Sequence, residues 1–546
     1  MLVPFSSAHE RLEPVGSGRA GTPGEAPVGS GRMGFETVHG YCWPQSQVGG
    51  ATVGLHLSSP GGRDVAVEVA RCGWRREVVW SDTVPADFHP TPHGAAQDGC
   101  GWPAAVVIDV DPTWRSGYYE VVLDVDVDGK PRRSHAFFVV RPPTGAPTAP
   151  ALLALSTTTW NAYNDFGGNQ LYTGATSVSF QRPMAPGYLH KPPGEGRRVT
   201  NQAPYDPQMT AHRGYLAANH LSPFAGSAGW PDWELPFLQW AEREGFAVDV
   251  VLNADLAEHP GLLAPTAAEG GYSLYLSVGH DEYWSGHMRD SVEGFIARGG
   301  HAAFLSGNTS FWQVRLEDPT PEGPAATMVG YKGFFKSDPV YGTDRIGELT
   351  AMWSDHEIGR PENEMTGVSF TRGGYHRIGK RATRGAGGYT IHRADHWLFE
   401  GTGLDYGDVL GGESRTVGYE CDGCDLTYRN GLPYPTGEDG TPLDFEILGT
   451  VPAAHFTRTT ATRPPAPDQP SEVEFIAARV AGGGRTPEHV ARVEHGHAVL
   501  GTSTSPAGGI VVTSGSTDWA HGLAGTDPTV EAVTRNLLTR LAAPPT

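Results

Sequence analysis

The chain has 546 residues, with 40 Lys or Arg against 61 Asp or Glu, so its formal net charge is −21. This acidity argues against nucleic acid or an anionic membrane surface as a partner, and no apolar run is long enough to predict a transmembrane helix. The length predicts more than one domain, and an 18% charged and 10% aromatic composition predicts a folded protein.

The first part of the chain predicts a tail, a β domain and a linker. Residues 1–40 are rich in Gly, Pro and Ser, which is typical of a flexible tail. They lack a basic segment followed by an apolar core, so we expect no signal peptide and a cytoplasmic location. Residues 41–143 alternate apolar and polar positions between turn residues, which predicts a β-sandwich. Residues 114–119 resemble the approach to a late strand of an immunoglobulin-like module, and the Pro-rich stretch 144–150 predicts a linker.

The remainder, 151–546, is predicted to be an α/β domain. Strand-like runs alternate with helix-like runs, which predicts a parallel sheet flanked by helices. Residues of about 320–500 are irregular and Gly-rich, so we predict a large insertion of strands and loops there. The predicted strands are 151–156, 246–251, 272–278, 302–306 and 510–514, and the predicted helices are 233–244, 285–296 and 529–538.

The run Gly279-His280-Asp281-Glu282-Tyr283-Trp284 lies between a predicted buried strand and a predicted helix. Ligands bind at the carboxyl ends of strands in open α/β sheets, and His, Asp and Glu are costly to bury without partners. These residue types serve metal binding and acid–base catalysis. The alternative is a capped helix start with Ser285 as N-cap. In a strand-like turn, Asp281 should point away from His280 and Glu282.

Two other polar and aromatic segments follow predicted strands of the same sheet, at 159–172 and 306–312. Both should therefore meet the His280 turn at one edge, and such convergence favours an active site. The chain has no phosphate-binding Gly-Lys loop, no dinucleotide fingerprint and no nucleophile elbow where the α/β pattern would place one. We therefore do not expect a nucleophilic serine or cysteine.

The five cysteines form no disulfide framework. Cys421 and Cys424 form a single Cys-x-x-Cys pair, which is interpreted either as a structural metal or redox site or as a tight turn.

These motifs together resemble the large (β) subunit family of N,N-dimethylformamidase. The resemblance rests on residues 162–164, Gly167-Gly168 with Tyr172, Arg182-Pro183, 279–284, 306–308, 417–420 and 514–519.

The resemblance implies an amidotransferase-like α/β domain with one ferric ion, Fe(III), on two tyrosinates and a glutamate. The glutamate corresponds to Glu282, and the tyrosines correspond to Tyr163 and Tyr172. His280 corresponds to the catalytic histidine of the family, and Asn308 to its active-site asparagine. For the second tyrosine, Tyr188, Tyr205 and Tyr215 remain alternatives to Tyr172.

The expected function is hydrolysis of a C–N bond in a small amide. Phenolate and carboxylate are hard donors that suit a trivalent cation, whose charge would deprotonate phenols of pKa near ~10. His280 would act as general base and acid, and Asn308 would orient the substrate or stabilise the oxyanion. The resemblance also implies a homo-oligomer and a small partner subunit. Alternatives are an iron enzyme of redox or rearrangement chemistry and a non-catalytic binding protein.

Overall fold

The structure is a computed structural model that describes residues 37–194, 207–264, 266–319, 324–376, 387–461 and 465–542. The predicted tail, except its last residues, and Tyr205 lie outside these ranges.

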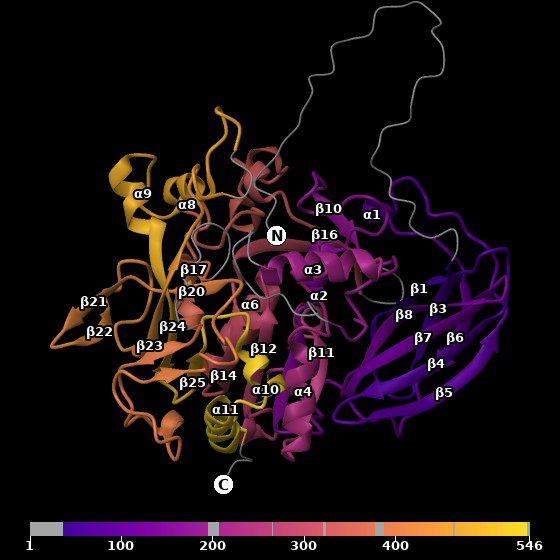
Figure 1. Ribbon diagram of the computed structural model, residues 1–546, viewed down its shortest axis with the longest axis horizontal. Helices are drawn as coiled ribbons and strands as arrows, with labels where there is room; N and C mark the ends of the chain where they lie inside the picture. The colour runs from indigo at the N-terminus through magenta and orange to yellow at the C-terminus, as the bar shows by residue number, and fades with distance from the viewer. Residues whose placement is uncertain are drawn as a thin grey trace, which may run out of the picture.

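The N-terminal part contains two sheets that enclose one apolar core (indigo in Figure 1). The three-stranded sheet has the order β1-β3-β6, and the five-stranded sheet has the order β2-β8-β7-β4-β5. Alternate residues such as Val53, Leu55, Val67 and Val69 are buried between them, as the period-two pattern predicts. The elements are β1 (His39–Trp43), β2 (Ser46–Gln47), β3 (Thr52–Ser58), β4 (Val65–Cys72), β5 (Arg76–Val84), α1 (Ala95–Asp98), β6 (Ala104–Asp109), β7 (Gly117–Val127) and β8 (Lys130–Val140).

A nine-stranded mixed sheet forms the centre of the molecule, and its first five strands, β11-β9-β12-β14-β25, are parallel. Their residues are almost all apolar because both faces are covered by helices. The strands are β9 (Ala151–Leu155), β11 (Val248–Leu252), β12 (Leu274–His280), β14 (His301–Gly307) and β25 (Ile510–Thr513).

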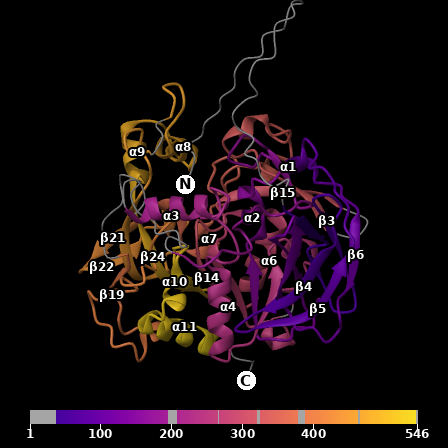
Figure 2. The ribbon, with the colours of Figure 1, turned by 45° about the vertical axis from the view of Figure 1, so that its right-hand side comes forward.

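Helices cover both faces of this sheet, as Figure 2 shows. Leu153 and Leu276 belong to one apolar cluster with residues of α4, α10 and α11, while Leu152 and Tyr275 belong to another with residues of α6, on the opposite face. The predicted parallel sheet with flanking helices is therefore present. The helices are α2 (Thr157–Tyr163), α3 (Pro207–Ala218), α4 (Glu234–Arg243), α5 (Asp255–Glu258), α6 (Gly286–Ala297), α10 (Trp519–Ala524) and α11 (Pro528–Leu541).

The region of about 320–500 contributes four strands to the same sheet. After β25 the order continues β24-β23-β18-β19, and every one of these pairings is antiparallel. What the sequence predicts as an insertion therefore extends the central sheet. Its strands are β18 (Tyr389–Ile391), β19 (Val409–Leu410), β23 (Glu446–Ala454) and β24 (His495–Thr504).

Smaller sheets and short helices surround this framework. One four-stranded sheet, β10-β16-β15-β13, lies beside the carboxyl ends of β12 and β14. These smaller elements are β10 (Ser177–Ser179), β13 (Tyr283–Ser285), β15 (Trp312–Pro319), β16 (Ala325–Val329), β17 (Ser369–Gly374), β20 (Cys421–Gly423), β21 (Leu426–Arg429), β22 (Leu432–Pro435), α7 (Asn363–Thr366), α8 (Glu472–Arg479) and α9 (Pro487–Glu494), with 3-10 helices η1 (Ala267–Glu269), η2 (Lys332–Ser337), η3 (Ile346–Glu348) and η5 (Trp397–Phe399).

The Cys-x-x-Cys pair begins in strand β20, so the tight-turn interpretation is wrong. Cys424 is the first residue after that strand. Cys421 packs into the main core and Cys424 into a separate small cluster, and both are free thiols.

In the described part of the chain, no helix combines the length and the apolar character needed to cross a membrane.

Candidate metal and catalytic centre

The end of β12 positions His280 and Glu282. The strand runs through His280, two residues beyond the prediction, because Gly279 and His280 still pair with Ser306 and Gly307 of β14. Gly279 adopts a φ of +85°. A Cβ atom on Gly279 would lie 2.4 Å from the Cβ of Trp233, so the backbone at position 279 is too close to Trp233 for any residue other than glycine. The helix that follows begins at Gly286, and its N-cap is Ser285, whose Oγ accepts a hydrogen bond from the Met288 amide. The capped helix start and the polar turn are both present.

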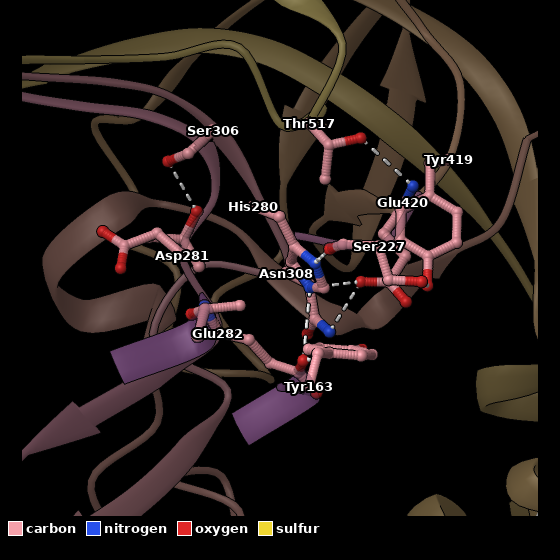
Figure 3. Close-up of polar contacts among 12 residues, drawn as sticks. Tyr163, Ser227, His280, Asp281, Glu282, Ser306, Asn308, Tyr419, Glu420 and Thr517 are labelled. Carbon is pink, nitrogen blue, oxygen red and sulfur yellow. Dashed lines mark hydrogen bonds and ion pairs between the residues drawn. The ribbon is translucent and has the colours of Figure 1, made fainter. Parts of the chain in front are cut away.

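The carboxylate of Glu282 is the centre of a cluster of buried oxygen atoms. Tyr163 donates to it at 3.1 Å, and Tyr172 lies 2.8 Å from both of its oxygens. Trp312 donates from its indole nitrogen at 2.9 Å. Figure 3 shows Tyr163, at the end of α2, directed toward Glu282. Side chains from three separate segments therefore meet on one carboxylate.

Burial controls the protonation of this cluster. Desolvation, followed by the charge of Glu282, raises the pKa of Tyr163 and of Tyr172 well above that of a free phenol. Burial alone would raise the pKa of Glu282, but the contacts with His280 outweigh it and lower that pKa. In the protein alone, both phenols are neutral and donate to an ionised carboxylate.

Lys332 adds a buried cation that the sequence analysis does not predict. Its Nζ donates to the Tyr283 hydroxyl at 2.9 Å, and that hydroxyl donates to Tyr172 at 2.8 Å. The same ammonium lies 3.2 Å from the ring centroid of Tyr172. Burial lowers the pKa of Lys332 to about 7, and the charges of Glu282 and Glu420 oppose that effect.

His280 lies between two carboxylates. Its Nδ1 is 2.6 Å from the Ser227 carbonyl, so Nδ1–H is the donor there, and its Nε2 is 2.7 Å from Glu420 and 3.3 Å from Glu282. Burial would lower the pKa of His280, but the two carboxylates outweigh it and raise that pKa well above the ordinary value. Nε2 is thus the nitrogen that can exchange a proton within the cluster (Figure 3).

Asn308 completes the cluster around Glu282 and Glu420. Its own φ is +50°. Its side-chain nitrogen donates to Glu420 at 2.9 Å, and the carboxylate of Asp422 holds its backbone amide at 2.8 Å. The carboxylate of Asp281 points away from His280, as predicted, and accepts from Ser277 at 2.7 Å (Figure 3).

The residues present fit a hard metal ion. Glu282 and the two phenols offer three oxygen donors that one ion could touch together. In addition, His280, Glu282 and Glu420 offer three ligating atoms within 4.8 Å of one another. The second oxygen of Glu420, Oε1, is buried and accepts no hydrogen bond from the described part of the chain. Buried charge and a buried acceptor without a donor are costly, and a bound cation would relieve both.

The structure brings together all five residues that the resemblance implies: Tyr163, Tyr172, His280, Glu282 and Asn308. The alternative tyrosines with described hydrogen bonds donate to backbone carbonyls. Tyr188 donates to the Tyr163 carbonyl and Tyr215 to the Pro192 carbonyl, and Tyr205 is not among the described residues. That these side chains bind a metal or act in catalysis remains a prediction.

Glu420 and Lys332 are site residues that the sequence does not predict. Glu420 lies within a segment used for the resemblance, next to Tyr419, yet nothing in its local pattern indicates a role. Glu420 is 0% exposed because its backbone packs against Gly307 at the end of β14. The backbone amide of Thr517 donates to the Glu420 carbonyl at 3.1 Å. Lys332 has no sequence signal, since a single lysine before Gly and Phe predicts an exposed turn.

Comparison with known proteins identifies relatives. The chain matches the family model described as N,N-dimethylformamidase beta subunit-like, C-terminal, over residues 66–532. The N,N-dimethylformamidase beta subunit of an Alcaligenes species is 27% identical over 252 residues, which cover 42% of this chain and 30% of that protein. The same subunit of Paracoccus aminophilus is 26% identical over 247 residues, with the same coverage of 42% and 30%.

The matched segments thus span about a third of the length of these curated relatives. Among solved structures, a family 123 glycoside hydrolase from Clostridium perfringens matches with a TM-score of 0.10 at 10% identity, over 22% of this chain and 27% of that chain. That likeness is too weak to bear on the fold.

Proposed function

The chain belongs to the N,N-dimethylformamidase beta subunit-like, C-terminal family, and from this we propose that it hydrolyses the C–N bond of a small amide. One observation carries the proposal. A buried carboxylate, Glu282, accepts hydrogen bonds from two phenols and lies beside a histidine that a second carboxylate, Glu420, holds in place. Such a combination of metal-type donors with an acid–base group suits hydrolysis.

Tyr163, Tyr172 and Glu282 would hold a single ferric ion. Their oxygens are hard donors, which trivalent cations prefer to thiolate or thioether. When bound, such an ion supplies Lewis-acid chemistry toward an amide carbonyl and water. Tyr163 and Tyr172 would then lose the protons that they donate to Glu282 in the protein alone.

His280 would move the proton of the reaction. Its Nδ1–H is held by the Ser227 carbonyl, so Nε2 is the nitrogen that exchanges protons. A cation bound at Glu282 would offset one of the two carboxylates that raise the pKa of His280, so that Nε2 would be neutral and could take a proton from the attacking water. The water oxygen forms a bond to the carbonyl carbon, the C–N bond breaks, and Nε2 returns the proton to the departing amine. Glu420, 2.7 Å from Nε2, stabilises the imidazolium formed between these steps.

Asn308 and the burial of the site would define the substrate. The Asn308 side-chain nitrogen, which donates to Glu420, is a neutral donor suited to an oxyanion or a carbonyl oxygen. Tyr163, His280, Glu282 and Glu420 are each at most 2% exposed. We therefore expect a small amide rather than a peptide or polymer as substrate.

Three further features belong to this proposal. We expect the α/β part to be amidotransferase-like, because it contains a parallel sheet flanked by helices. We expect the two N-terminal sheets to form an immunoglobulin-like sandwich, because they enclose one shared core. The matched relatives are named as beta subunits, so we also propose that this chain works in an oligomer with a smaller partner subunit.

The test is amine release from N,N-dimethylformamide and a panel of small formamides and acetamides by the iron-loaded protein. We expect His280→Gln to lose roughly 10²- to 10⁴-fold in kcat, the usual worth of a general acid–base group. The matched control is His455→Gln, because His455 forms a buried pair with Glu472, 2.9 Å away, outside the cluster. Full activity in His280→Gln, or no amine release from any amide by the iron-loaded protein, would contradict the proposal.

A further inference from the structure

A second group of ligating side chains lies where the N-terminal sheets meet segment 182–194. It consists of Glu120 in β7, His135 in β8 and His190 in that segment, and we call it the interface triad. We propose that the interface triad binds one divalent transition-metal ion of the zinc class and thereby joins the N-terminal sheets to the rest of the molecule. This site is independent of the proposed amide hydrolysis.

The geometry of the triad suits one ion. The Nε2 of His135 and the Nδ1 of His190 each lie 3.7 Å from the same oxygen, Oε1 of Glu120. All three ligating atoms lie within 4.8 Å of one another. The two imidazole rings stack with centroids 4.5 Å apart. The 3.7 Å separations are too long for hydrogen bonds but fit two ligands on a single ion.

Glu120 is held in a position to bind. Its other oxygen, Oε2, accepts from Arg76 at 2.8 Å, which fixes the carboxylate and leaves Oε1 facing the histidines. Arg76 also pairs with Glu68 at 2.7 Å. Two carboxylates therefore share one guanidinium, and the net charge of these three groups is negative, which favours a cation.

His190 is also fixed by its surroundings, although its side chain is 48% exposed. The next residue, Lys191, is buried and forms an ion pair with Asp232 at 2.6 Å. Two residues earlier, Tyr188 donates to the Tyr163 carbonyl at 2.6 Å. Because the backbone is anchored on both sides, little ordering is needed for His190 to bind a metal.

His135 presents a lone pair to the site. Its side chain is 15% exposed, and its Nε2 is the ring nitrogen that faces Oε1 of Glu120. A neutral imidazole is the form that binds metals. The sulfur of Cys72 lies 4.0 Å from the other oxygen of Glu120, Oε2, and does not belong to the triad.

The donor set indicates the class of ion. Two imidazoles and one carboxylate are typical ligands of zinc, and the exposure of His190 leaves a fourth position to solvent. This set is softer than the oxygen cluster around Glu282, so the two sites would select different ions. Because the ligands come from β7, β8 and segment 182–194, the ion would bind the folded chain in preference to the unfolded one.

The test is titration of the full-length protein with Co²⁺, whose visible spectrum reports its coordination, followed by displacement with Zn²⁺. We expect one equivalent to bind wild type and Glu282→Gln alike, and His190→Gln to lose at least about 10-fold in affinity, since even outer-shell partners are worth that much. The exposed His93, outside both clusters, gives the matched control His93→Gln, which should bind as wild type.

A second readout is thermal unfolding. Zn²⁺ should raise the Tm of wild type and of His93→Gln in a concentration-dependent way, and should not raise that of His190→Gln. His135→Gln should lose the same Co²⁺ spectrum. Equal Co²⁺ affinity in His190→Gln and His93→Gln, or a Co²⁺ signal that depends only on Glu282, would overturn the proposal.

Discussion

At the level of single residues, the site depends on a small set of buried charged side chains that stabilise one another. Glu282 and Glu420 are buried carboxylates, and His280 and Lys332 are the buried cations that face them. Isolated charges at such depth are very costly, so each depends on the others. The oxygens of Tyr163 and Tyr172 complete the cluster as neutral donors.

The contribution of Lys332 can be tested by Lys332→Met, which keeps the length of the side chain and removes the charge. The ammonium lies over Tyr172 and holds Tyr283 against it, so its loss should disfavour the tyrosinate form. We expect kcat/KM for amide hydrolysis to fall roughly 10- to 100-fold, as for other groups that support metal ligands.

Lys336→Met is the control for that change, because Lys336 lies on the same 3-10 helix, η2, and is exposed. Its activity should equal that of wild type. If Lys332→Met were as active as Lys336→Met, the buried ammonium would have no role in the site.

The sequence predicts part of this cluster and not the rest. His280 and Glu282 share a hexapeptide at a strand end, where physical reasoning alone indicates a site. Tyr163, Tyr172 and Asn308 enter through the family resemblance. Glu420 and Lys332 could not be predicted, because they come from segments with no periodic pattern and are placed by tertiary packing next to the smaller sheets that contain β20 and β16.

At the level of elements, the strong hydrophobic patterns predict their structures well. The apolar runs at 151–156 and 302–306 are β9 and β14, and the helix predicted at 233–244 is α4, Glu234–Arg243. The region of about 320–500 was harder, because β18 pairs with β23, and β23 with β24, although the strands of each pair lie far apart in sequence. Local propensity does not report such pairings.

The geometry at Gly279 tests how β12 positions His280. Gly279→Ala would both force a side chain into a φ of +85° and press a methyl group against Trp233. We expect a loss of about 3 kcal/mol or more in the free energy of unfolding, combining backbone strain with overpacking. The measurement is urea unfolding, together with the activity of the folded variant.

Gly270→Ala is a matched control, since Gly270 has nearly the same φ, +84°, with nothing within 4 Å of an added Cβ. It should lose only about 1 kcal/mol from strain. Equal losses in the two variants would show that the contact with Trp233 does not constrain β12.

At the level of the whole molecule, the N-terminal sheets and the central sheet share a core. Phe137 of β8 packs against Trp160 of α2 with ring centroids 5.5 Å apart, and Tyr118 stacks on Trp230 at 4.1 Å. Arg71 pairs with Glu242 across the same boundary at 2.6 Å. Because α2 ends at Tyr163, the N-terminal sheets support the cluster around Glu282 directly.

Two adjacent residues of β8 can be used to distinguish support of the Glu282 cluster from a general contribution to stability. Phe137 packs into the core shared with α2, whereas Phe138 packs into the core between the N-terminal sheets. We expect Phe137→Ala and Phe138→Ala each to lose about 3–5 kcal/mol of stability, as buried aromatic truncations do. Only Phe137→Ala should also lower amide hydrolysis at temperatures where the variants are folded. Equal activities of the two would contradict the coupling.

The most direct test of the central claim is metal analysis with a visible absorption spectrum on the purified protein, beside Glu282→Ala and Tyr163→Phe. Tyr275→Phe is the matched control, because Tyr275 is a buried tyrosine of β12 that faces away from the cluster. We predict one iron per chain and a phenolate-to-iron charge-transfer band that is lost or shifted in both site variants and unchanged in the control. A colourless protein without iron, or a band that Tyr163→Phe and Glu282→Ala leave unchanged, would contradict the tyrosinate site.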